Sequence, residues 1–147
     1  RHIEAERPTL GICVGMQMLF DYSDEFGRHD GLGVLRGHVR RIAPSASAEV
    51  TPKVPHIGWA ELVRPVEAND DRWRGTPLDG IGATDSVYFV HSYTAVPANP
   101  AHRLADTYYF GDRISAAVQR DVLFGTQFHP EKSGPVGLDV LRRFAQA

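Results

Sequence analysis

The strongest constraint on the fold is a short strand that leads directly into a helix through a turn flanked by glycines. Residues 8–13 form an apolar stretch typical of a buried strand, and the apolar residues within 14–20 are spaced for one face of a helix. Gly11 and Gly15 flank Cys13, which lies at the turn. Glycine has no Cβ atom, so a strand and a helix can approach closely around a strained central residue. The segment therefore predicts an α/β fold with Cys13 at a strand end.

The rest of the chain predicts more strands than helices. Alternating apolar and β-branched residues predict strands at 34–42, 59–66, 87–91, 104–110, 114–119 and 122–128. Gly111 and Asp112 separate two of these strands and favour a hairpin turn. Turn-forming residues predict irregular connections at 44–52 and 67–85. The apolar spacing within 136–144 predicts a second helix that packs on the sheet.

Composition bounds the domain count and the classes of partner. The chain has 147 residues, of which 42% are hydrophobic, so residues 1–147 are expected to form a single domain with one core. A formal charge of -2 gives no reason to expect a nucleic-acid or membrane-surface partner. The single cysteine cannot form an internal disulfide, and neither a basic-then-apolar N-terminal segment nor an apolar span of about 18 residues suggests secretion or membrane insertion. We therefore expect a cytoplasmic protein.

The position of the first strand is unusual for such a fold. A buried strand at 8–13 almost opens the sequence, although strands of a parallel sheet need neighbours on both sides to pair their backbone groups. We therefore expect the domain to be truncated at its N-terminus, with upstream strands and helices missing.

The glycine-flanked turn gives Cys13 the properties of a catalytic nucleophile. A strand-to-helix elbow exposes the residue at its apex, and the Val14 N–H points to where a developing oxyanion would lie. The positive end of the following helix favours the thiolate. A structural role for Cys13 stays open on this motif alone, because free cysteine is among the most buried residue types.

A second motif, the strand-like segment 125–132, supplies a base. His129 and Glu131 are two residues apart, so an extended backbone places both side chains on the same side. Pro130 between them lacks an N–H, so sheet pairing should stop there and leave both at a strand end. His129 would accept the Cys13 proton and later donate it to a leaving amine, while Glu131 orients the imidazole. The sequence thus predicts a catalytic triad.

Two other interpretations also fit this second motif. His129 could simply end a strand, with Glu131 solvated. A histidine and a glutamate at this spacing also occur in zinc deaminases, where the glutamate moves protons. Those enzymes need two further cysteine ligands, and Cys13 is the only cysteine in the sequence. We therefore expect no metal.

Five segments carry a resemblance to a known family. They are Gly11 to Gln17, Pro55 to Trp59, Tyr88 to Tyr93, Gly125 to Gly134, and Gly137 to Phe144. They resemble the class I (triad) glutamine amidotransferases, and the second, third and fifth resemble the glutaminase subunits of imidazole glycerol phosphate synthase. The resemblance implies a flavodoxin-like, three-layer α/β fold, with a central mixed sheet flanked by helices and Cys13 at the carboxyl end of a central strand.

The resemblance also implies glutamine hydrolysis without a metal or an organic cofactor. The Cys13 thiolate would attack the side-chain amide of L-glutamine, His129 would protonate the departing ammonia, and water would hydrolyse the thioester to glutamate. Ammonia would then pass to a cyclase subunit with a (β/α)8 barrel, the partner in a heterodimer. That partner would make imidazole glycerol phosphate in histidine biosynthesis.

Residues that hold the glutamine follow from the same resemblance. Gln17 and the main chain around His91, Ser92 and Tyr93 would cradle the substrate. A simpler interpretation makes Gln17 an exposed helix residue.

Three further residues would face the partner subunit, namely Trp59, Tyr88 and Lys132. They could instead be two core aromatic residues and a solvated charge. The chain has Ala60 where the family commonly has asparagine, which removes a polar side chain from the expected interface.

A second departure concerns the start of the domain. The family begins with a longer segment whose glycine-rich loop supplies the second oxyanion donor, whereas only twelve residues precede Cys13 here. We therefore expect this fragment alone to be nearly inactive. Two alternatives stay open: a glutaminase of the same class from anthranilate or GMP synthesis, and a non-catalytic binding domain.

Overall fold

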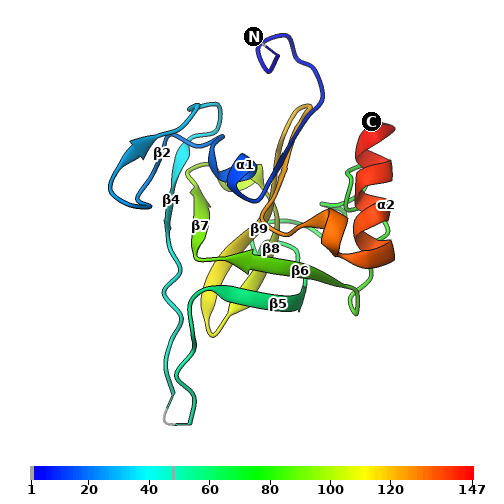
Figure 1. Ribbon diagram of the computed structural model, residues 1–147. Helices are drawn as coiled ribbons and strands as arrows, with labels where there is room; N and C mark the ends of the chain where they lie inside the picture. Colours follow the sequence, from blue (N-terminus) through cyan, green and yellow to red (C-terminus); the bar gives the residue numbers. More distant parts are fainter. Residues whose placement is uncertain (1, 48) are drawn as a thin grey trace.

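The computed structural model describes residues 2–47 and 49–147 and confirms the α/β class (Figure 1). The sheet that carries the predicted nucleophile contains, in spatial order, β1 (Thr9–Ile12), β10 (Leu123–Thr126), β9 (Asp112–Arg120) and β8 (Arg103–Tyr109). β1 and β10 run parallel, whereas the other neighbours in this sheet run antiparallel. The sheet is therefore mixed, as the family resemblance implied.

The remaining strands form a second sheet and a separate pair. The second sheet contains β3 (His29–Asp30), β2 (Tyr22–Ser23), β4 (Gly37–Arg41) and β7 (Tyr93–Pro97), and the pair consists of β5 (His56–Glu61) and β6 (Ser86–His91). The helices are α1 (Val14–Gln17), α2 (Gly134–Ala145) and the short 3-10 turns η1 (Pro100–His102) and η2 (Pro130–Lys132). No helix within the described ranges is long and apolar enough to cross a membrane.

Two apolar clusters cover the two faces of the sheet that contains β1. Successive residues of β10 point to opposite faces. Phe124 belongs to the cluster that includes Val140 and Phe144 of α2, which lies along one side of the sheet in Figure 1. Leu123 belongs to the other cluster, together with Met16 of α1. The sheet is thus packed on both faces.

The helix boundaries agree with the sequence at one end of the chain and differ at the other. The predicted helix at 136–144 lies within α2, but the helix predicted at 14–20 ends at Gln17. Leu19 N–H donates to Met16 O at 3.1 Å, and Phe20 N–H donates to Gln17 O at 3.3 Å. Bonds to a carbonyl three residues back tighten the turn. The tighter turn buries the side chains of both donors in the core.

The strand boundaries agree well only in the second half of the chain. The strands predicted at 87–91 and 104–110 are displaced by one residue at most. The strand predicted at 59–66 instead begins at His56 and ends at Glu61, because the chain then turns and Val63 forms an isolated bridge with Asp106.

Three strands were not predicted, and one predicted turn is displaced. The strands are β2, β3 and β7. β2 and β3 have two residues each, too few to show an alternation, and β7 is separated from β6 by Ser92 alone, so no turn signal marks its start. The hairpin between β8 and β9 turns at Phe110 and Gly111, one residue earlier than predicted. Both residues have positive φ, 46° and 83°, as a two-residue hairpin turn requires.

Only one of the two glycines beside Cys13 is required by close packing. A Cβ atom on Gly11 would lie 2.8 Å from the backbone carbon and oxygen of Gly15, so strand and helix could not approach as they do. A Cβ atom on Gly15 would meet nothing within 4 Å. The close approach predicted from the sequence therefore depends on the first glycine.

This asymmetry predicts that two matched substitutions affect the free energy of unfolding differently. Gly11→Ala should lower the free energy of unfolding by about 1–3 kcal/mol, because the added methyl group overlaps backbone. Gly15→Ala should leave it unchanged or raise it by up to about 1 kcal/mol, because alanine favours a helix. Urea unfolding of both variants measures the difference. Equal destabilisation by the two would contradict the packing described here.

Candidate active site

Cys13 occupies a strained turn between β1 and α1. Its backbone has φ 54° and ψ -112°, a combination that residues with a side chain rarely adopt. The Cys13 N–H donates to Thr126 O at 2.7 Å, which fixes the turn to the end of β10. The strain and this anchor hold the side chain at the edge of the sheet, as the elbow predicted.

The parallel register brings the histidine segment to the same edge. Ile12 pairs with Thr126, so the residues that follow β1 and β10 leave the sheet side by side. His129 N–H donates to Tyr88 O at 2.9 Å, and the Cys13 thiol donates to Val90 O at 3.9 Å. Both residues are therefore held by carbonyl groups of β6 that lie two positions apart.

A buried serine for which no role was predicted holds the His129 backbone from its other side. Ser133, 1% exposed, accepts a hydrogen bond from Tyr88 N–H at 2.9 Å and donates one to His129 O at 2.6 Å. Tyr88 and His129 are thus joined both directly and through this hydroxyl group. The sequence carried one signal for it, the position of Ser133 directly after the histidine motif.

Glu131 orients the imidazole of His129. Its Oε1 atom lies 2.7 Å from His129 Nδ1. A carboxylate can only accept, so Nδ1 carries the proton and Nε2 is left free to accept another. The His129 ring is 18% exposed and the Glu131 side chain 45% exposed, so the pair lies at the edge of the molecule. The spacing of two residues thus produces the predicted contact.

The sulfur of Cys13 lies in an environment that favours the neutral thiol. Burial raises the pKa of Cys13 above its ordinary value, and the negative charges of Glu131 and Glu25 raise it further. The Val14 N–H and the Gln127 side chain act in the opposite direction. Among the contacts of residues 2–47 and 49–147, the thiol hydrogen bonds involve Val90 and Gln127 and none involves His129. A base is therefore needed to form the thiolate.

The residues expected to cradle glutamine meet around one carbonyl group. Gln17 is 8% exposed, so it is not the surface helix residue of the simpler interpretation. Its Nε2 donates to Tyr93 O at 3.2 Å, and His91 Nδ1 lies 2.8 Å from the same oxygen. Ser92 lies between β6 and β7, and its carbonyl accepts Ile42 N–H at 2.9 Å.

A buried histidine pair adjoins this group and was not anticipated. His56 Nδ1 lies 3.0 Å from His91 Nε2, and the His56 ring stacks on Phe89 and Tyr109. Burial lowers the pKa of His91 to about 4, so it is neutral at pH 7. The sequence offered no signal for the pair, because the two residues lie on different strands.

A cavity of about 340 Å³ adjoins the turn that carries Cys13, because the next residue, Val14, lines it. Val14 and Gln17 line one side of it, and Glu25 and Asp30 add two carboxylates from the segment around β2 and β3. Its other lining residues are Met18, Ser23, Phe26, His29 and Gly31. Glu25 belongs to no sequence motif and was therefore not predicted.

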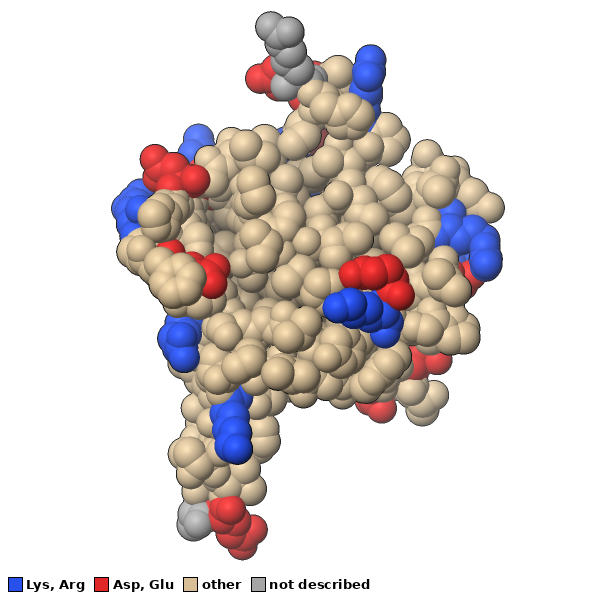
Figure 2. Space-filling view, in the orientation of Figure 1, with Lys and Arg blue, Asp and Glu red and all other residues tan. Residues whose placement is uncertain are grey.

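Two of the three residues expected at a partner interface, Trp59 and Tyr88, pair on neighbouring strands. Trp59 is 59% exposed and packs edge-to-face on Tyr88, with ring centroids 5.9 Å apart, so it is not a core residue. Ile57 is also 59% exposed, and Lys132 is exposed. Figure 2 shows few charged side chains over β5 and β6. Ala60 is half-buried on the same strand and pairs with Val87.

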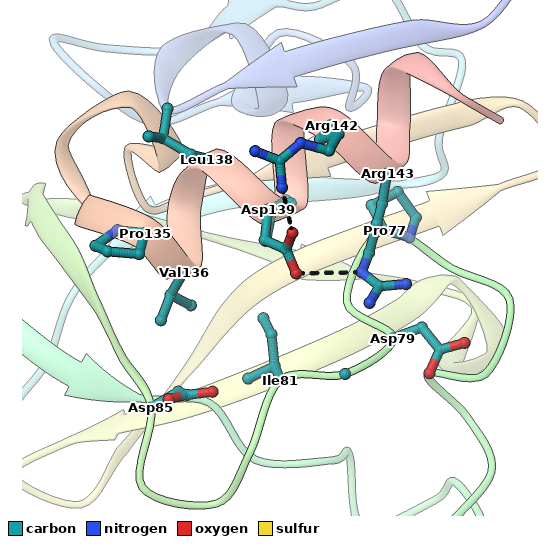
Figure 3. A pocket seen from close by; sticks show the side chains of 12 residues that line it. Pro77, Asp79, Ile81, Asp85, Pro135, Val136, Leu138, Asp139, Arg142 and Arg143 are labelled. Atoms are coloured by element: carbon teal, nitrogen blue, oxygen red, sulfur yellow. Dashed lines mark hydrogen bonds and ion pairs between the residues drawn. The ribbon is translucent and has the colours of Figure 1, made fainter.

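A second hollow, of about 440 Å³, lies between α2 and the connection before β6 (Figure 3). Asp139 faces Arg142 and Arg143 there, with its oxygens 2.9 Å and 3.5 Å from their nitrogens. Neither cysteine nor histidine is among its lining residues. It therefore offers neither a thiol nor an imidazole, and its carboxylates come from Asp79, Asp85 and Asp139. Within the described residues, no group of three or more histidine, cysteine, aspartate or glutamate side chains could hold a metal ion.

Comparisons with known proteins identify the family to which the chain belongs. Residues 1–147 match the family model described as glutamine amidotransferase class-I. Imidazole glycerol phosphate synthase subunit HisH 1 of Legionella pneumophila (strain Lens) is 49% identical over 140 residues, which cover 95% of this chain and 65% of the relative. Subunit HisH of Geobacillus thermodenitrificans (strain NG80-2) is 49% identical over 140 residues, 93% of this chain and 60% of the relative. The chain thus spans less than two thirds of these relatives.

A solved structure supports the fold. A glutamine amidotransferase from Thermotoga maritima superposes with a TM-score of 0.53 and 20% sequence identity, over 99% of this chain and 48% of that one. This similarity concerns the fold alone, and it agrees with the predicted flavodoxin-like arrangement.

The environment of the sulfur predicts how Cys13 reacts without substrate. Because burial and two carboxylates raise its pKa, alkylation by iodoacetamide should be slow at pH 7 and still increase above pH 9. Mass spectrometry of the peptide that contains Cys13 measures the rate at each pH. A rate that already levels off below pH 8 would show that the thiolate is favoured, contrary to this environment.

Proposed function

The chain belongs to the class-I glutamine amidotransferases, and on this premise we propose that its protein hydrolyses glutamine to glutamate and ammonia at Cys13. The observation that carries the proposal is the anchoring of Cys13 and His129 on two carbonyl groups of β6, with Glu131 2.7 Å from the imidazole. We also propose that residues 1–147 belong to one glutamine amidotransferase domain.

The proposed reaction begins when the Cys13 thiol turns from Val90 O towards His129. The thiol proton leaves Val90 O and passes to His129 Nε2, which is free because Glu131 holds Nδ1–H. The thiolate then attacks the side-chain carbonyl carbon of glutamine. A tetrahedral intermediate forms and its oxygen becomes negative.

The intermediate collapses when His129 returns the proton to the nitrogen and ammonia leaves, which produces a thioester on Cys13. His129 then takes a proton from water, hydroxide attacks the thioester carbonyl, and the thiol and glutamate are released. The Val14 N–H already lowers the pKa of Cys13 through a backbone hydrogen bond. It is also the proposed donor to the oxyanion.

The cavity beside Cys13 is the proposed glutamine site. Its volume of about 340 Å³ suits an amino acid, and its two carboxylates suit an α-ammonium group. Glu25 is close enough for its charge to raise the pKa of Cys13. We propose that Glu25 binds the α-ammonium while Gln17 and the segment His91 to Tyr93 hold the remainder of the substrate.

The relatives support a proposal for the destination of the ammonia. They are subunits of imidazole glycerol phosphate synthase, and at 49% identity they favour this enzyme over anthranilate or GMP synthesis. We propose that a cyclase subunit, a (β/α)8 barrel, receives the ammonia in a heterodimer for histidine biosynthesis. The exposed pair of Trp59 and Tyr88, with Lys132, forms the proposed contact surface. A cytoplasmic location accords with such a biosynthetic enzyme.

Replacing Cys13 distinguishes glutamine hydrolysis from the role of a non-catalytic binding domain. In the full-length protein bound to its cyclase, Cys13→Ala should reduce glutamine-dependent product formation by at least about a thousandfold, because no thioester can form. Product formation from added ammonium salt should persist. Loss of both activities to the same extent would reject the assignment, and unchanged glutamine use would indicate a non-catalytic role for Cys13.

The proposed role of Glu25 predicts a change in substrate affinity. Glu25→Gln should raise KM for glutamine about tenfold or more with a smaller change in kcat, because the lost charge acts on the substrate ammonium. Asp24→Asn is the matched control, since Asp24 is exposed and does not line the cavity. Steady-state kinetics of the full-length complex provide both constants. An unchanged KM in Glu25→Gln would exclude this role.

A further inference from the structure

One carbonyl oxygen determines the direction of a chain of hydrogen bonds that ends at the nucleophile. Tyr93 O lies 3.2 Å from Gln17 Nε2 and 2.8 Å from His91 Nδ1. A backbone carbonyl can only accept, so both neighbours must present N–H groups to it. Its two lone pairs are then occupied. The orientation of the Gln17 side-chain amide is therefore set by the backbone.

The orientation of a second amide follows from the first. Gln17 Nε2 has two protons, and its other contact is Gln127 Oε1 at 3.0 Å. Gln127 must turn its oxygen towards Gln17, which directs its own Nε2 towards Cys13 Sγ, 3.6 Å away. The amide ends of glutamine look alike, and this chain of contacts decides between them.

Gln127 has little freedom to leave this position. Its side chain is fully buried at 0% exposure, and its backbone N–H donates to Ala116 O at 2.8 Å on β9. It follows Thr126, the last residue of β10, whose carbonyl holds the Cys13 N–H. The amide donor and the sulfur are thus fixed to the same strand end.

We propose that Gln127 is a further catalytic residue, whose Nε2–H donates a hydrogen bond to the sulfur of Cys13 and stabilises the thiolate before it attacks. The proposal rests on the proposed function of Cys13 as nucleophile. No proton is transferred to or from Gln127. His129 removes the thiol proton, and the Gln127 donor lowers the free energy of the charged sulfur that remains.

The surroundings of the sulfur explain why such a donor is needed. Glu131 and Glu25 both disfavour negative charge on Cys13, and burial does so more strongly. The charge of Glu131 cannot be removed, because that carboxylate orients His129. A neutral donor that is buried and already oriented opposes these effects without adding a charge, and it needs no reorganisation when the thiolate forms.

The test measures the thiolate directly, without glutamine. In the full-length protein bound to its cyclase, Gln127→Met keeps the length of the side chain and removes the donor. Alkylation of Cys13 by iodoacetamide at pH 8 should become about tenfold slower, with its pH profile moved to higher pH, on the scale of a hydrogen bond to a charged group. The kcat for glutamine hydrolysis should decrease by a similar factor.

Two further variants distinguish a direct effect on sulfur from a packing defect. Gln119→Met makes the same change on the neighbouring strand β9, where the side chain lines a different cavity, and should leave the alkylation profile unchanged. Gln127→Asn keeps the amide but shortens its reach, so it should slow alkylation as Gln127→Met does. Gln127→Asn also replaces Gln127→Met in the test if the methionine variant fails to fold.

The outcomes separate this proposal from the proposed function. A folded Gln127→Met or Gln127→Asn variant with the wild-type alkylation profile would overturn the role of Gln127, even if the unaltered complex hydrolyses glutamine. If alkylation slows as expected but the unaltered complex does not hydrolyse glutamine, the hydrogen bond stands and the proposed function fails. Equal slowing in Gln119→Met would assign the effect to general packing and reject the proposal.

Discussion

The parallel pairing of β1 with β10 is the interaction on which the site depends. Its register places Ile12 beside Thr126, so the chain segments that follow both strands emerge at one edge of the sheet. Cys13 follows one strand and His129 the other, although 116 positions separate them in the sequence. A shift of one residue would turn every side chain of β10 to the opposite face and separate the candidate triad.

Backbone carbonyl groups then orient the side chains of the site. β6 provides two of them, Tyr88 O for the His129 backbone and Val90 O for the Cys13 thiol. Tyr93, just beyond β6, provides a third, which orients Gln17 and His91 together. These acceptors belong to strands whose apolar side chains pack into the core. The reactive side chains are therefore held by the fold more than by one another.

The elements with clear periodicity were predicted well, and those defined by turns were not. The helix at 136–144 and the strands at 87–91 and 104–110 have enough residues to show their period. The helix after Cys13 proved shorter than predicted, because tertiary packing buries Leu19 and Phe20 through a tight turn. The isolated position of the strand pair β5 and β6 has no counterpart in any local pattern.

By itself, the sequence determined which side chains could perform the chemistry and how they are presented locally. The glycine-flanked Cys13 defines an elbow, and the spacing of His129 and Glu131 defines an oriented base, because both depend on neighbours in the chain. Only the tertiary structure decided that Gln127 directs its amide nitrogen at the sulfur and that Glu25 lines the adjoining cavity. Those features depend on contacts between distant segments, and a local sequence pattern does not predict which atoms of such segments meet.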